Sequence, residues 1–293
     1  MFGECHAHFF MNGYDYKEAV ATHRDQVQDA CIRTWFKAYQ EKGVSFIRDG
    51  GDAYGVSKRA KELAPEYGMD YRTPVFAIHK NGHYGGIVGF GFDTMKEYRN
   101  LVRKAAQEGA DFIKIMVSGI MDFHRCGLLT DTPLPRDEIR EMIHIAHEEG
   151  MAVMAHANGN EAVLNAVEAG VDSVEHGNYV QEECLLAMAQ SRAVWVPTLA
   201  TIGNLRGCAR YPQEEVGRIF QRASGQLREG YRLGVRLALG SDAGAYLIRH
   251  GRGVLDEYRC FQEILGDDPQ LESRLHQGEE EIRARFLRGS SDK

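Results

Sequence analysis

Two histidines with the spacing of a metal-binding pair occur almost at the start of the sequence. The segment GECHAHFF, residues 3–10, places His6 and His8 one residue apart among apolar residues. In a β-strand, residues i and i+2 point to the same side of the sheet, so both imidazoles could chelate one ion. The competing interpretation is two solvated or hydrogen-bonded histidines on an ordinary strand, and the rest of the sequence must decide between them.

Three further potential ligands lie near the ends of apolar segments. They are His156 in MAVMAHA, His176 in VDSVEHG and Asp242 in VRLALGSDAG. A single histidine or aspartate at such a place usually forms a turn or satisfies a local hydrogen bond. Imidazole nitrogens and carboxylate oxygens are nevertheless the ligands that zinc and similar divalent ions prefer. Their recurrence at corresponding places favours one metal site over independent coincidences.

Lys114 interrupts the apolar segment DFIKIMVSG, residues 111–119, where a buried strand is expected. Burial of an unpaired ammonium shifts its pKa by about 3–5 units, or roughly 4–7 kcal/mol, which is comparable with the net stability of a domain. Such a lysine must be paired, neutral or modified. A neutral amine can react with carbon dioxide to give a carbamate, an anionic oxygen ligand. The alternative is an ion pair with a carboxylate across the interior of the fold.

Short apolar segments alternate with amphipathic helical patterns along the whole chain, which is typical of parallel βα units. Helices are predicted over residues 95–109, 135–150 and 253–265. The pattern predicts an α/β fold, a single-domain (β/α)8 TIM barrel over residues 1–266. Residues 267–293 form a charged extension that is either part of the same domain or partly disordered, with EEEIRARFL as a surface helix. The eight predicted strands are residues 3–9, 44–50, 74–80, 111–119, 151–157, 171–177, 193–200 and 235–244.

The C-terminal ends of barrel strands form the active site of this fold, so the predicted ligands should converge there. With 293 residues, of which 43% are hydrophobic, the chain can bury a large core. The net charge of −7 comes without a basic run, which argues against nucleic acid as a partner. We find no apolar stretch of about 18 residues and no leader pattern, which predicts a cytoplasmic protein away from membranes. A small-molecule substrate is expected, and a homo-oligomer is compatible with the sequence.

Five motifs occur in an order that resembles the amidohydrolase superfamily: HAH, FIKIMVSG, AHANG, VEHG and GSDAG. The segment from EIREMIHIAHEEG to VEHG, followed by WVPTL and LGSDAG, is similar to the imidazolonepropionase-like and prolidase-like branch. The resemblance spans nearly the whole chain. It implies a metal-dependent hydrolase that acts on a C–N bond of a small amide, cyclic amide or dipeptide-like substrate.

The resemblance also implies a role for each motif residue. His6 and His8 with Asp242 would hold one divalent ion, and His156 with His176 a second. Carboxylated Lys114 would bridge both ions together with a hydroxide. Zinc suits these ligands best, and two ions about 3.5–4 Å apart would acidify the shared water. Asp242 would act as the general base that takes the proton of the hydroxide.

The sequence departs from the family pattern at its start and leaves two main alternatives open, besides decarboxylation and hydration, which also occur in the superfamily. Many members carry a small β-sandwich, but only five residues precede His6, so the sandwich is expected to be absent or reduced. One alternative is a mononuclear-metal deaminase, which typically has a glutamate three residues after the strand-5 histidine. Here that position is Gly159, with Glu161 two residues further on. The other alternative is an inactive barrel that serves as a binding or assembly protein.

Residues at the remaining strand ends are candidates for substrate contact. Arg48 could clamp a carboxylate or pair with Asp49. The glycine-rich segment HKNGHYGGIVGFGF, residues 79–92, is predicted to be a flexible lid. The candidate substrate-binding residues are Arg48, His83, Tyr84, Ser118, Thr198 and His250.

Overall fold

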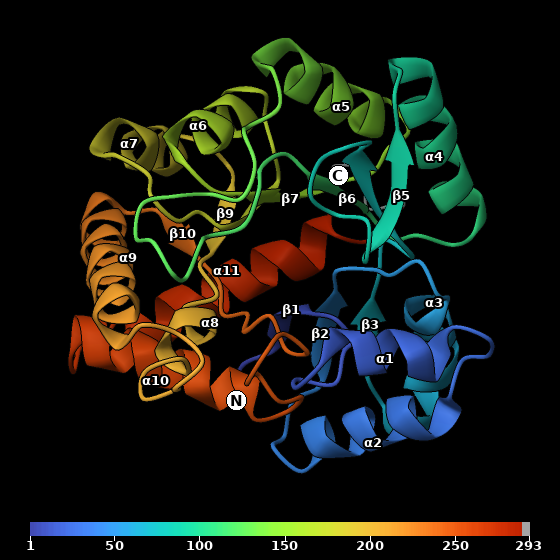
Figure 1. The fold of residues 1–293 in the computed structure, drawn as a ribbon, viewed down its shortest axis with the longest axis horizontal. Helices are drawn as coiled ribbons and strands as arrows, with labels where there is room; N and C mark the ends of the chain where they lie inside the picture. The colour runs from blue at the N-terminus through green and yellow to red at the C-terminus, as the bar shows by residue number, and fades with distance from the viewer. Residues whose placement is uncertain (289–293) are drawn as a thin grey trace.

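Parallel strands surrounded by helices form the centre of the computed structural model, which describes residues 1–288 (Figure 1). One sheet contains β1 (Glu4–Ala7), β2 (Phe46–Asp49) and β3 (Asp70–Arg72) in that order. The second sheet has the order β10-β9-β8-β7-β6-β4-β5. Its strands are β4 (Ala77–Lys80), β5 (Gly89–Phe92), β6 (Ile113–Met116), β7 (Val153–Ala157), β8 (Ser173–His176), β9 (Val194–Val196) and β10 (Arg236–Leu237).

Backbone hydrogen bonds join the two sheets beside β1. The N–H of Cys5 donates to Leu239 O at 3.0 Å, and the N–H of Asp242 donates to His6 O at 2.8 Å. On the other side, β3 pairs with β2 and β4 pairs with β6, so residues 70–80 bridge the sheets. The strands thus follow one another around a barrel, and the predicted α/β TIM-barrel fold is confirmed.

The third predicted strand, residues 74–80, begins later than expected. Pro74 has no N–H to donate to a neighbouring strand, and Val75 adopts a left-handed backbone with φ of 66°. Regular pairing therefore resumes only at Ala77, whose strand β4 lies beside β6. The short strand β3 before this break was not predicted.

The predicted lid contains a further strand, which corrects the expectation of a flexible loop. Residues 89–92 form β5, which pairs with β4 in parallel. A Cβ atom on Gly89 would lie 1.7 Å from the carbonyl oxygen of Ala77, so only glycine permits this approach. Part of the glycine content of this segment therefore serves strand pairing.

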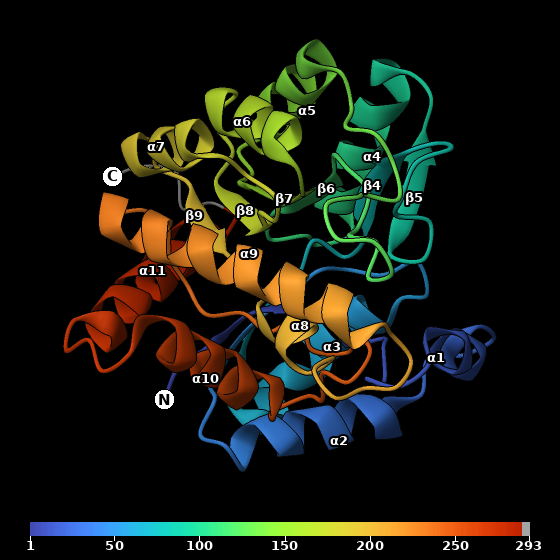
Figure 2. The same ribbon diagram turned by 60° about the vertical axis from the view of Figure 1, so that its left-hand side comes forward.

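Helices cover the outside of the barrel, and Figure 2 shows α9 lying beside α8 and α10. The capping box of Thr94 and Glu97 begins α4, which together with α5 and α10 matches the predicted helices to within two residues. No helix among residues 1–288 is long and apolar enough to cross a membrane. The helices are α1 (Tyr16–His23), α2 (Asp29–Gln40), α3 (Val56–Leu63), α4 (Met95–Gln107), α5 (Arg136–Glu148), α6 (Asn160–Glu168), α7 (Glu182–Gln190), α8 (Ala200–Gly203), α9 (Gln213–Leu233), α10 (Gly253–Leu265) and α11 (Leu271–Arg285), with a 3-10 helix over Ala64–Tyr67.

The charged extension supplies the floor of the barrel. Helix α11 buries Ile282, and Phe286 follows it into the same cluster, which also contains Phe46, Phe112 and Val194. These partners lie at or just before the first residues of their strands, so α11 covers the end of the barrel opposite the ligands. The expected surface helix is thus an amphipathic core element. The remaining predicted extension, residues 289–293, lies outside the described residues.

Replacing Phe286 with alanine should destabilise the protein. The ring is fully buried against Phe112 at a centroid distance of 5.3 Å, and the guanidinium carbon of Arg48 lies 4.4 Å from its centroid. We expect the free energy of unfolding to fall by about 3–5 kcal/mol in a denaturant titration. Leu186→Ala, on the exposed face of α7, should cost less than about 1 kcal/mol. Equal losses in the two variants would contradict this role of α11.

Candidate metal centre and active-site cavity

Three predicted ligands converge where β1 meets the segment after β10. Potential ligand atoms of His6, His8 and Asp242 all lie within 4.8 Å of one another. The Nε2 atoms of both histidines are 3.6 Å from Asp242 Oδ1, which is longer than a hydrogen bond. His6 Nε2 is buried without any hydrogen-bond partner. Neutral imidazoles and a carboxylate around an orphaned nitrogen fit a divalent metal ion.

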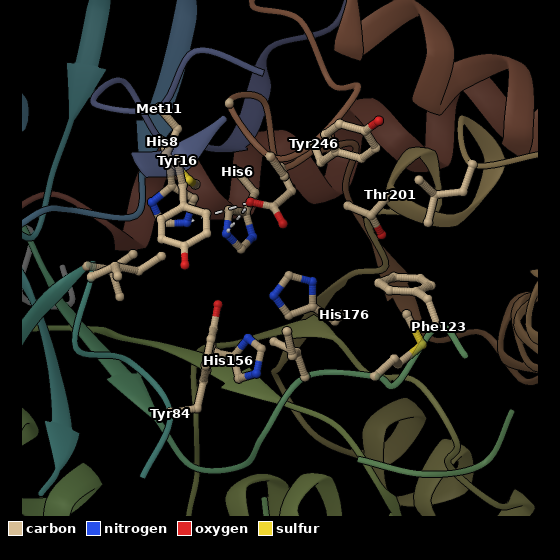
Figure 3. A pocket seen from close by; sticks show the side chains of 18 of the residues that line it. His6, His8, Met11, Tyr16, Tyr84, Phe123, His156, His176, Thr201 and Tyr246 are labelled. Atoms are coloured by element: carbon tan, nitrogen blue, oxygen red, sulfur yellow. Dashed lines mark ion pairs between the residues drawn. The ribbon is translucent and has the colours of Figure 1, made fainter. Parts of the chain in front are cut away.

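His156 and His176 lie beside this cluster from the neighbouring strands β7 and β8 (Figure 3). Their ring centroids are 4.6 Å apart, and the ring of His176 is 5.1 Å from that of His6. His156 donates from Nε2 to the carbonyl oxygen of Gly119 at 3.1 Å, and His176 Nδ1 is hydrogen-bonded to Thr198 Oγ1 at 2.7 Å. One nitrogen of each ring is thereby fixed and the other is left for a ligand, an arrangement typical of metal-binding histidines.

Strained backbone positions these strand-end residues. His176, Thr198 and Asp242 have φ angles of 69°, 50° and 61°. Left-handed conformations at non-glycine residues cost on the order of 1–3 kcal/mol each and cluster at functional sites. The imidazole of His8 also needs a glycine beside it, because a Cβ atom on Gly50 would lie 2.3 Å from Cε1 of His8. The local sequence therefore gives up stability to hold the ligands.

Burial sets the protonation of the cluster. It lowers the pKa of His8 and of His156 to about 3, so both rings are neutral and able to bind a metal at physiological pH. Burial also lowers the pKa of Lys114 to about 8, and it raises the pKa of Asp242 to about 6. Lys114 is 1% exposed, and its amine makes no hydrogen bond or salt bridge within residues 1–288. The predicted alternative of a directly paired lysine is therefore not what the structure contains.

These residues line one cavity of about 510 Å³ at the C-terminal ends of the strands. Figure 3 shows the tyrosines Tyr16 and Tyr84 reaching toward the histidines, with Phe123 and Tyr246 further along the wall. Tyr16 begins α1, the other three side chains come from loops after strands, and sequence reasoning missed all of them except Tyr84. Asn158 and Asn178 also line the cavity, each two residues after one of the histidines His156 and His176. That repeated spacing, visible in AHANG and EHGN, is the signal that could have identified them.

The comparison with known families decides the classification. The sequence model of the amidohydrolase family matches residues 2–261. The chain belongs to the amidohydrolase family.

Relatives of this amidohydrolase include proteins with and without a named activity. The chain is 31% identical over 187 residues to an uncharacterized protein of Mycobacterium tuberculosis, covering 61% of this chain and 49% of the relative. It is 25% identical over 281 residues to ochratoxinase of Aspergillus niger, and the match covers 82% of this chain and 56% of that relative. The structure of a prolidase solved with N-methylphosphonate-L-proline matches with a TM-score of 0.70 and 25% identity. The match covers 91% of this chain and 70% of the prolidase chain. The chain spans about half the length of the curated relatives it matches.

Arg48 lies inside the amidohydrolase barrel and away from the cavity lining, contrary to its predicted contact with substrate. Its guanidinium is fully buried and donates to Glu175 Oε1 at 2.8 Å, to Ser173 Oγ at 2.8 Å and to Cys5 O at 2.7 Å. Asp49, the alternative partner, faces the other side of β2 because adjacent strand residues alternate. Glu175 Oε2 in turn accepts from His6 Nδ1 at 2.8 Å. Arg48 thus helps to position His6 through Glu175.

Four other predicted substrate contacts also lie off the cavity lining. His83 pairs with Asp131 at 2.9 Å. Ser118 accepts the N–H of Asn158. Thr198 holds His176 as described above, and buried His250 stacks on Trp35 at 4.7 Å and donates to Met11 O at 2.9 Å. Their polar atoms serve neighbouring residues, because each is buried or tied to a loop. Of the six candidates, the structure brings Tyr84 to the cavity.

Glu175→Gln should weaken both the fold and the metal site. The substitution leaves the buried guanidinium of Arg48 without an anionic partner, which should cost about 3–5 kcal/mol in the unfolding of metal-free protein. Glutamine offers one acceptor oxygen where Glu175 offers two, so either His6 or Arg48 then faces an amide N–H, and the affinity for zinc should fall about 10–100-fold in a metal titration. The control Glu148→Gln, in an exposed pair with Arg99, should leave both measurements unchanged. Unchanged stability and affinity in Glu175→Gln would contradict the positioning role.

His250 should make a specific contribution to acid sensitivity. Burial lowers the pKa of His250 to about 4 from 6.5, so the unfolded state takes up a proton first as the pH falls. The contribution of this group is complete above pH 6.5 and is lost between pH 6.5 and 4, up to about 3 kcal/mol. His250→Gln should therefore flatten the fall of unfolding free energy in this interval, measured by denaturation across a pH series. The exposed His144→Gln should not, and a slope unaltered by His250→Gln would contradict the assignment.

Proposed function

We propose that this amidohydrolase is a metal-dependent hydrolase that cleaves a C–N bond of a small amide, cyclic amide or dipeptide-like molecule. The supporting observation is the convergence of His6, His8 and Asp242 on one point of the cavity, beside His156 and His176. Similarity to an ochratoxinase and to a prolidase is consistent with hydrolysis of such a bond.

The proposed centre holds two divalent ions, with zinc as the best match to the ligands. His6, His8 and Asp242 would hold one ion, His156 and His176 would hold the other, and carboxylated Lys114 would contribute to both. When bound, divalent ions supply Lewis acidity that activates water and polarises a carbonyl group.

Carboxylation of Lys114 is proposed from its surroundings. The amine is buried among histidines and has no direct partner, so a neutral amine or an anionic derivative is favoured over a free ammonium. In the reaction, the amine nitrogen attacks the carbon of carbon dioxide and releases one proton, which leaves a carbamate anion. This anion would balance the cationic charge of a metal centre.

The residues of the chain would assist the reaction in separate ways. Asp242 Oδ1 faces the Nε2 atoms of His6 and His8 and is the proposed general base that takes a proton from water and passes it to the leaving nitrogen. Burial raises the pKa of Tyr84, so its phenol stays protonated and can donate a hydrogen bond to a substrate oxygen. Its ring lies 5.1 Å from that of His156, within the same cavity.

The deaminase alternative finds less support in the cavity. Gly159, with φ of 84°, precedes α6, and Glu161 is exposed in the first turn of that helix. No glutamate occurs among the described residues that line the cavity, so a carboxylate to shuttle protons is available only from aspartate. An inactive binding protein would not need six potential metal ligands in one place. It would also not need the strained backbone conformations of His176 and Asp242. The cytoplasmic location and the homo-oligomer stay predictions from the sequence.

Metal analysis of a Lys114 variant tests the proposal. The full chain, produced with zinc and bicarbonate, should contain close to two metal ions by elemental analysis and should hydrolyse members of a library of N-acyl amino acids and dipeptides. Lys114→Ala should contain fewer ions and lose at least about 100-fold in kcat/KM. Lys58→Ala, at an exposed lysine, serves as the control.

A different result would redirect the assignment. One ion per chain in both wild type and Lys114→Ala would contradict the binuclear centre and favour the deaminase alternative. Two ions without hydrolysis of any amide would contradict the proposed reaction and leave the metal site in place.

A further inference from the structure

An arginine on an aromatic wall of the cavity has no role in the proposed chemistry. Arg210, in the segment between α8 and α9, lines the same cavity as the histidines. Its guanidinium carbon lies 4.5 Å from the ring centroid of Tyr246 and 5.5 Å from that of Tyr211. Three loops build this wall, because Phe123 also packs against Tyr211, at 5.4 Å.

Arg210 lacks a partner of opposite charge. Within residues 1–288 its guanidinium takes part in no salt bridge and no hydrogen bond, and its contacts are the two tyrosine faces. Stacking on aromatic rings restricts the side chain and leaves the N–H groups at the edge of the guanidinium free to donate. A planar, restrained guanidinium is suited to bind a carboxylate through two parallel hydrogen bonds.

The other charges of the lining agree with an anionic ligand. Apart from the proposed metal centre, the charged lining residues are Asp15, Lys17 and Arg210. The carboxylate of Asp15 already accepts the N–H of Lys17 at the start of α1, at 2.7 Å. Asp15 keeps its negative charge in this bond, so Lys17 and Arg210 (+2) together with Asp15 (−1) give this part of the lining one net positive charge, which would attract an anion to a protein whose net charge is −7.

Apolar side chains make up much of the remaining wall. Met121, Phe123 and Leu205 line the cavity together with Tyr211 and Tyr246. Apolar lining buries an apolar group of the ligand, while a few polar groups orient it. The volume of about 510 Å³ lies within the range of small-molecule sites. A ligand that satisfies both features carries a carboxylate next to an apolar side chain.

We propose that Arg210 binds the free carboxylate of the substrate, and that the substrate is an N-acyl amino acid or a dipeptide with an apolar side chain. This inference rests on the proposed C–N hydrolysis. It assigns Arg210 as the residue that binds the carboxylate end of the substrate, which the proposed metal ligands do not contact. Arg210 is then a specificity-determining residue, since a compound without the carboxylate leaves the guanidinium without a partner.

Two probes of matched size separate this role from the reaction itself. N-acetyl-L-phenylalanine carries the carboxylate, and N-acetyl-2-phenylethylamine lacks it. Calorimetric titration of the zinc-loaded full chain should show at least about tenfold tighter binding of the first probe, as expected for a charged bidentate pair. Arg210→Met should remove this difference. Arg222→Met is the control, because Arg222 also stacks on a tyrosine, Tyr179 at 5.0 Å, but does not line the cavity.

Kinetics provide a second readout. For cleavage of N-acetyl-L-phenylalanine, Arg210→Met should raise KM at least about tenfold and change kcat by less than about threefold, because binding of a remote group is lost. Arg210→Lys should recover part of the affinity and less of the selectivity, since an ammonium cannot form the two parallel bonds.

The outcomes distinguish this inference from the proposed function. Equal binding of both probes to wild type, no binding of the carboxylate probe up to about 10 mM, or an unchanged preference in Arg210→Met would overturn the role of Arg210. Carboxylate-selective binding that depends on Arg210, without any amide cleavage, would support the anchor and contradict the hydrolase assignment. Cleavage of both probes at equal rates would support hydrolysis and contradict the anchor.

Discussion

The buried pairing of Arg48 with Glu175 connects the parts of this protein that must stay in register. Through these two side chains, β2 is tied to the backbone of β1 at Cys5 and to Ser173 on β8. Both charges lie in the barrel interior, where each would be costly without the other. The remaining carboxylate oxygen holds His6, so the geometry of one candidate ligand depends on an ion pair that spans the barrel. Fold and site therefore share a single polar network.

The convergence of the candidate ligands could be predicted because parallel strands impose it. Apolar segments marked the strands, and their C-terminal ends meet at one end of a barrel whatever the loops do. His6, His8 and Asp242 follow from that rule alone. The sequence also showed that Lys114 is not an ordinary core residue, because it stands within an apolar segment. Strand β3 was not predicted because Asp70 and Arg72, two of its three residues, are charged and leave no apolar segment to mark it.

Partners of polar side chains could not be predicted in the same way. Arg48 is adjacent in sequence to Asp49 but pairs with a residue 127 positions later, because strand alternation separates neighbours and barrel closure joins distant residues. His250 follows a predicted strand and Ser118 lies near the end of another, yet local burial turns their polar atoms toward the backbone. The wall around Arg210 depends on the conformations of three loops, which hydrophobic periodicity does not encode. The sequence was informative about the barrel and much less so about the cavity entrance.

The floor that α11 provides has a consequence for the order in which the protein is made. Strands from both sheets begin against Ile282 and Phe286, and the N–H of Gly3 donates to Glu279 at 2.8 Å, 276 positions away. A nascent chain on the ribosome cannot complete this core until residue 286 has been synthesised. Until then, the apolar strand starts stay accessible to water and to chaperones. Maturation of the barrel is therefore coupled to synthesis of α11 rather than proceeding strand by strand.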